Sequence, residues 1–160
     1  GYDSSGQTGQ TRHWWLGSGV PTGTQPVSVD LASATTIDFQ MVCITVTADG
    51  DITQVDADRL LENRANPSVV LSYGGYTCMT ILSVISGRDD PTEVADLGTA
   101  TRIADHDFGS QTGVVSRQTT PGTADYTAGY TIAADDCGFG ASCYRDLGIA
   151  VGRSSVVILG

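Results

Sequence analysis

The sequence predicts a mainly β protein, either an antiparallel β-sandwich or a barrel, with one short helix at about residues 56–65. Three observations carry this prediction. The 160-residue chain is rich in Thr and Gly but has no Lys and only two Glu, which are common on helix surfaces. Apolar and polar residues alternate in several short segments. About eight to ten short strands at intervals of roughly ten residues are expected, bounded by turn signals such as Asp-Gly, Gly-Gly and Pro-Gly, as in sandwiches and barrels.

The chain is predicted to consist of an N-terminal arm and one domain. Residues 1–26 are rich in Gly, Ser and Thr and poor in apolar residues, so we expect an extended arm. Residues 27–160 are long enough to bury a core and are predicted to form a single β-rich domain. The arm is interrupted by an aromatic cluster that we interpret as an assembly or binding anchor, made of Trp14, Trp15 and Leu16.

The first predicted strands follow the arm. Residues 27–31 alternate cleanly, and residues 37–47 are apolar on both faces at their centre, as in a central strand. The dipeptide at 49–50 is Asp-Gly, a signal for a two-residue hairpin. Residues 51–55 are therefore expected to form the returning strand.

The predicted helix comes next. Asp56 is a candidate N-cap, and Asn66-Pro67 marks the end of the helix because the residue before Pro avoids the α conformation. Residues 68–73 and 76–86 are predicted strands on either side of a Gly-Gly dipeptide, which is a further hairpin candidate.

The second half of the chain has weaker signals. Residues 87–111 are polar and are predicted to form turns and loops. Short strands are expected at 114–115 and 126–134. Residues 135–143 are predicted to form a small disulfide-closed loop, and residues 147–159 a closing hairpin.

The four cysteines are predicted to form two disulfides, because an even number of Cys in a Thr-, Gly- and Asp-rich chain is typical of exported proteins. Of the three pairings, we favour Cys43 with Cys78, between strands, and Cys137 with Cys143, across a short Gly-containing loop. A zinc site is disfavoured because neither spacing matches the C-x2–4-C pairs of such sites.

Calcium is the one cofactor that the sequence suggests. Four carboxylates gather around the predicted hairpin and helix start, and calcium takes several carboxylate and carbonyl ligands from such loops. The EF-hand spacing is not met, and turn and cap chemistry accounts for the same residues. The candidate ligands are Asp49, Asp51, Asp56 and Asp58.

Charge and hydropathy limit the partners. The net charge of −10 and the absence of Lys argue against nucleic-acid binding. No run of 18 apolar residues occurs, so no membrane span is expected. The chain begins with Gly1 and contains Cys, and we expect an extracellular or cell-surface protein, exported with its leader removed.

Three functions remain open. The first is an extracellular structural subunit of a filament, surface layer or coat, which uses the arm to contact further copies or another extracellular protein. The second is a secreted module that binds carbohydrate or protein through Trp14 and Trp15. The third is a small secreted hydrolase that uses Asp residues or His106. Because no G-x-S-x-G or phosphate-loop motif occurs, a non-enzymatic role is favoured.

Overall fold

The computed structural model contains only strands as regular structure in the part of the chain that it describes. That part comprises residues 11–16, 23–28, 41–48, 51–87, 95–96, 100–109, 111–120, 125–146 and 153–159. No helix that is long and apolar enough to cross a membrane occurs within these ranges. The strands are β1 (His13–Leu16), β2 (Val42–Ala48), β3 (Ile52–Arg64), β4 (Ser68–Ser72), β5 (Cys78–Ser86), β6 (Ala95–Asp96), β7 (Thr101–Asp107), β8 (Thr112–Thr120), β9 (Asp125–Thr131), β10 (Asp135–Asp146) and β11 (Arg153–Leu159).

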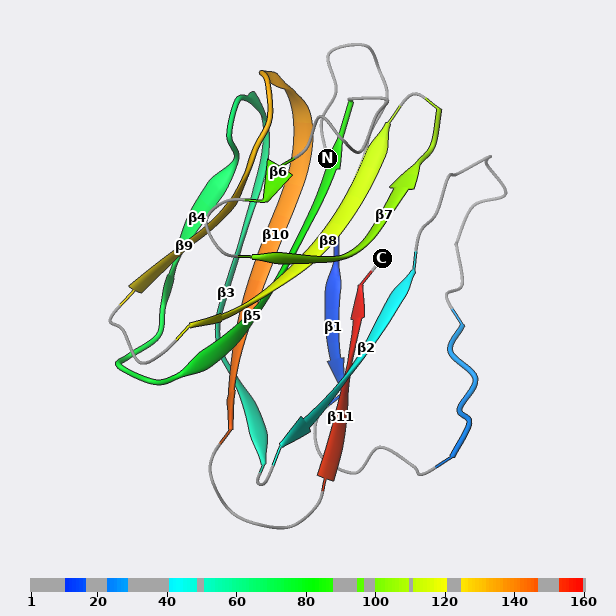
Figure 1. Cartoon of the computed structure of the whole chain (residues 1–160), viewed down its shortest axis with the longest axis vertical. Helices are drawn as coiled ribbons and strands as arrows, with labels where there is room; N and C mark the ends of the chain where they lie inside the picture. Colours follow the sequence, from blue (N-terminus) through cyan, green and yellow to red (C-terminus); the bar gives the residue numbers. More distant parts are fainter. Residues whose placement is uncertain are drawn as a thin grey trace.

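The strands form three antiparallel sheets, which confirms the predicted mainly β sandwich (Figure 1). A five-stranded sheet with the order β3-β10-β5-β8-β7 is the central layer. A three-stranded sheet, β4-β9-β6, packs on one face of it. The third sheet, β1-β11-β2, packs on the other face and joins the two ends of the chain.

The alternation of side chains along β5 explains why both faces of the central sheet are covered. Leu82 and Val84 point into the main core toward β4 and β9, whereas Ile81 points into a second core that includes Val42 and Ile44 of β2. Since successive residues of a strand face opposite sides, a nearly continuous apolar run is required for a strand buried on both faces.

The helix predicted at 56–65 is wrong. These residues belong to β3, which pairs along its whole length with β10, from Ile52 opposite Asp146 to Arg64 opposite Asp135. Pairing with β10 therefore overrides the helical propensity of the Leu, Glu and Arg residues. Because β3 is an edge strand, its charged residues also make this edge a poor template for pairing with other chains.

The loop predicted at 135–143 is wrong as well. These residues form most of β10, which lies between β3 and β5 in the central sheet. Phe139 and Ala141 are buried in the main core, and the intervening Gly140 and Ser142 face the third sheet. The glycines weaken the local strand signal, so the period-two alternation of this segment is not evident in its sequence.

Two predicted hairpins connect different sheets. Gly74 and Gly75 have φ values of 59° and 82°, as expected for a Gly-Gly turn, and the Tyr76 N–H donates to the Tyr73 carbonyl (3.1 Å). However, β4 and β5 on either side of this turn belong to different layers. The same holds for β2 and β3 around the dipeptide at 49–50, which itself lies outside the described residues.

Several other sequence predictions have outcomes in the described ranges. The strand predicted at 37–47 overlaps β2, and those at 68–73 and 126–134 contain β4 and most of β9. Residues 101–107, predicted as loop, form β7 because they pair with β8. The predicted first strand of the closing hairpin, at 147–151, falls outside the described residues. The second strand of that hairpin corresponds to β11.

Neither predicted disulfide is formed, since all four cysteines are free thiols. Cys137 and Cys143 lie on one extended strand, about 20 Å apart at 3.3 Å per residue, so they cannot bond. Cys43 is exposed on β2, whereas Cys78 is buried in the main core beside Cys143, with which it shares a thiol hydrogen bond. Burial raises the pKa of Cys143 to about 12, so this thiol stays protonated.

Candidate functional site

The predicted arm contributes a strand to the protein's own fold. β1 pairs antiparallel with β11, with Trp14 opposite Ile158 and Leu16 opposite Val156. In Figure 1 the blue β1 runs beside the red β11, so the two ends of the chain share one sheet. On its other side β1 has no strand partner among the described residues.

His13 fastens β1 to the central sheet. Its Nδ1 lies 2.7 Å from the Ser142 Oγ on β10, and its Nε2 lies 2.7 Å from the Ser83 Oγ on β5. Both serines are buried. A neutral imidazole donates through one nitrogen and accepts at the other, so the ring satisfies one hydroxyl on each strand. We call this arrangement the histidine clip.

The clip favours neutral histidine. Burial lowers the pKa of His13 to about 4, because an imidazolium in this position loses its hydration. The ring is therefore uncharged at neutral pH.

Gly140 on β10 leaves the space into which β1 fits. A Cβ atom at this position would lie 3.0 Å from the Thr11 Oγ1 and 3.6 Å from the His13 Nε2. The first distance is tighter than ordinary van der Waals contact, so with a Cβ at position 140 the Thr11 side chain would have to move by a few tenths of an ångström. A glycine on a strand commonly marks such a close approach.

The substitution Gly140→Val is expected to weaken β1 docking by about 1–3 kcal/mol, because the added methyl groups collide with Thr11 and His13. Trp14 and Trp15 are the only tryptophans and both lie in β1, so a red shift of the intrinsic fluorescence reports its release. An unchanged emission spectrum together with unchanged urea denaturation would contradict this role of Gly140.

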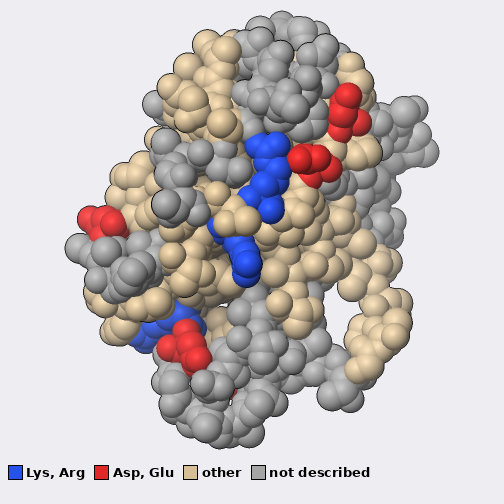
Figure 2. Space-filling view, in the orientation of Figure 1, with Lys and Arg blue, Asp and Glu red and all other residues tan. Residues whose placement is uncertain are grey.

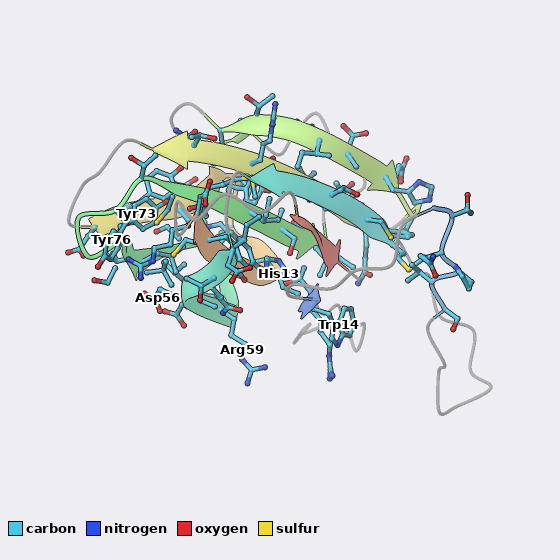
Figure 3. The ribbon with its side chains drawn as sticks, turned by 90° about the horizontal axis from the view of Figure 1, so that it is seen from below. His13, Trp14, Asp56, Arg59, Tyr73 and Tyr76 are labelled. Carbon is cyan, nitrogen blue, oxygen red and sulfur yellow. The ribbon has the colours of Figure 1, made fainter. Side chains whose placement is uncertain are left out.

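A cavity of about 520 Å³ opens beside the clip, between β1, β3 and β10. Trp14, 41% exposed, and Arg59 line it and project on the same side of the molecule (Figure 3). Register places Arg59 opposite Gly140 and Ala57 opposite Ser142, so both β3 residues share the face on which the clip lies. Arg12, Gln54 and Asp58 complete the polar part of the lining.

The predicted anchor is thus only partly described. Trp14 lines the cavity. Trp15 and Leu16 follow it in β1, and their backbones pair with β11, but their side chains are outside the described set. Sequence reasoning identified the aromatic pair and missed His13, the neighbour that holds the strand in place.

The predicted calcium ligands are not gathered into one site in the described part of the chain. Asp49 lies outside the described residues. The extended conformation spreads the stretch from Asp51 to Asp58 over about 23 Å. Asp56 instead accepts the Ser72 N–H of β4 at 2.8 Å, which ties two sheets together. No group of three or more His, Cys, Asp or Glu side chains that could hold a metal ion occurs among the described residues, and calcium binding stays a prediction.

The serine–histidine contacts do not resemble a nucleophilic site. Ser83 and Ser142 are buried, and both ring nitrogens of His13 are engaged by hydroxyls, so no carboxylate orients the ring. A pKa of about 4 also makes His13 a weak base at neutral pH. The other histidine, His106, is exposed on β7 and packs edge-on against Phe108.

Comparison with known proteins finds no matching family model, no matching curated protein and no matching solved structure.

Proposed function

We propose that this protein is an extracellular structural subunit whose arm strand, β1, is exchanged between copies during assembly. In this arrangement β1 of one copy pairs with β11 of its neighbour and inserts His13 between Ser83 and Ser142 of that neighbour. The observation that carries the proposal is that β1 docks through one strand edge and one side-chain clip.

The length of chain between β1 and β2 supports exchange. Residues 17–41 comprise 25 residues, which span up to about 80 Å when fully extended. A segment of this length is long enough for β1 to pair with a subunit packed directly against its own. Strand addition of this kind gains backbone hydrogen bonds and fills a side-chain slot in one step.

The surface composition agrees with close packing of subunits. Only 16% of the residues are charged, compared with about 25% in typical domains. On the face shown in Figure 2, uncharged residues cover most of the described surface. Little charge must be desolvated when such faces meet, although the net charge of −10 favours assembly in salt over assembly in dilute buffer.

A disulfide-trapping experiment tests strand exchange. Leu16→Cys with Val156→Cys places thiols on paired positions of β1 and β11, in a background in which the exposed Cys43 is replaced by Ser. We expect oxidation of a concentrated sample to give a ladder of covalent oligomers on a non-reducing gel, since the two cysteines belong to different copies.

The matched control is Thr45→Cys with Val156→Cys, which bridges β2 and β11 within one domain and is expected to give monomers. Deletion of residues 1–16 is expected to abolish assembly measured by light scattering. If the first variant yields only cross-linked monomer at every concentration, and the full chain scatters as a monomer, the proposal is wrong.

A further inference from the structure

We infer that the cavity between β1 and β3 binds a saccharide that carries a carboxylate, such as a uronic acid unit. Nothing in the assembly proposal requires a ligand here. The cavity needs β1 to be docked, whichever copy β1 comes from, so binding is testable separately from assembly. Its volume of about 520 Å³ lies within the range of about 300–1,000 Å³ for small-molecule sites.

Trp14 supplies the surface for a sugar ring. Its side chain is 41% exposed although large aromatic side chains are usually well buried, and it lines the cavity. An indole of this kind offers a flat apolar face to the C–H groups of a pyranose, with a ring N–H at its edge. The histidine clip holds the preceding residue, so the backbone that presents Trp14 is fixed in advance.

The charges in the cavity select a carboxylate. The whole chain has only eight cationic side chains, all Arg, and two of them, Arg12 and Arg59, line this one cavity. A guanidinium donates two parallel hydrogen bonds to a carboxylate, which makes Arg the preferred partner for planar anions. The Arg59 guanidinium has no acidic partner among the described residues.

The remaining lining groups suit sugar hydroxyls. Gln54 on β3 offers both a donor and an acceptor, and Asp58 offers an acceptor at the rim. The Asp58 Oδ1 accepts the backbone N–H of Arg59 at 2.7 Å, which fixes this carboxylate against the β3 backbone. The combination of an exposed indole, two guanidinium groups, one carboxylate and neutral polar groups matches an acidic sugar better than a purely apolar ligand.

The net charge of −10 opposes an anionic ligand at long range but not within the site. Charges farther away than about 8 Å are largely screened at physiological ionic strength, whereas Arg12 and Arg59 act at contact distance. We therefore expect binding to persist at physiological salt and to be strongest for a ligand with one or a few carboxylates rather than a dense polyanion.

Calorimetric titration of the full chain with a short oligomer of galacturonic acid, and with the neutral galactose oligomer of the same length, tests the inference. We expect the acidic oligomer to bind at least about tenfold more tightly. Arg59→Gln is expected to remove about this difference while leaving the neutral oligomer unchanged. Trp14→Ala is expected to weaken both, because both rings use the indole.

Arg117→Gln is the matched control, since Arg117 is an exposed arginine on β8 of the same sheet and outside the cavity. It is expected to leave binding unchanged. The inference is overturned if neither oligomer binds, if both bind equally, or if Arg59→Gln and Arg117→Gln have equal effects. Binding of an acidic peptide such as oligo-aspartate in place of the sugar also overturns it.

Discussion

Acidification from pH 7 to pH 4.5 is expected to release β1 from the central sheet while the sandwich itself stays folded. The pKa of His13 is lowered from 6.5 in the unfolded chain to about 4 in the clip, so the docked state disfavours the proton. Stability from the clip is complete above pH 6.5 and is lost as the pH falls from 6.5 toward 4. The full shift corresponds to about 3 kcal/mol, at about 1.4 kcal/mol per pH unit.

This loss is larger than the contribution of the clip's own hydrogen bonds, which hold β1 on the central sheet. The two hydrogen bonds of the clip contribute about 1 kcal/mol each. The charged groups that line the adjoining cavity are Arg12, Asp58 and Arg59, and the two guanidinium groups give an imidazolium no compensation. The strand should therefore detach before the main core, which contains no histidine within the described residues.

Tryptophan fluorescence follows β1 and far-UV circular dichroism follows the whole fold, so the two signals are expected to separate between pH 6.5 and 4.5. His13→Gln is expected to remove the fluorescence transition, because glutamine does not titrate. His106→Gln, which changes the exposed histidine on β7, is the matched control and is expected to keep it. A fluorescence signal that is flat down to pH 4.5 in the unmodified protein would rule out this behaviour.

Replacement of Phe139 by Ala is expected to destabilise the protein by about 3–5 kcal/mol, since it empties the centre of the main core. Phe139 is completely buried on β10 and meets the Tyr130 ring edge-on, with 5.9 Å between centroids. The Tyr130 hydroxyl in turn donates to the Leu82 carbonyl (3.2 Å). The space left by the missing Phe139 ring would therefore also weaken this hydrogen bond between two sheets.

Urea denaturation followed by circular dichroism measures this effect. If Phe139→Ala fails to fold, Phe139→Leu retains most of the volume and is expected to lose about 1.5 kcal/mol. Val70→Ala, at a position on β4 that is 60% exposed, is the control and is expected to change stability by less than about 0.5 kcal/mol. A loss below about 1 kcal/mol for Phe139→Ala would contradict the central place of this ring.

The sequence predicted only part of the candidate site. Trp14 was identified because a tryptophan pair in a polar segment is unusual. The partners of His13 were not identifiable, since Ser83 and Ser142 lie 70 and 129 residues away. Arg59 lies within the predicted helix at 56–65, and its place in the same cavity lining as Trp14 depends on the pairing of β3 with β10.

The sequence by itself determined the β class and the approximate positions of several strands, since 37–47, 68–73 and 76–86 were predicted where β2, β4 and β5 lie. These features are local, because Thr-rich alternating segments suit a half-buried pleated surface. Only the tertiary structure decided that 52–64 and 135–146 are neighbouring strands. It also decided that the four cysteines remain free thiols and that the arm docks through His13. Those outcomes depend on pairing between distant segments. The free energy gained from this pairing exceeds the local conformational preferences of the residues involved.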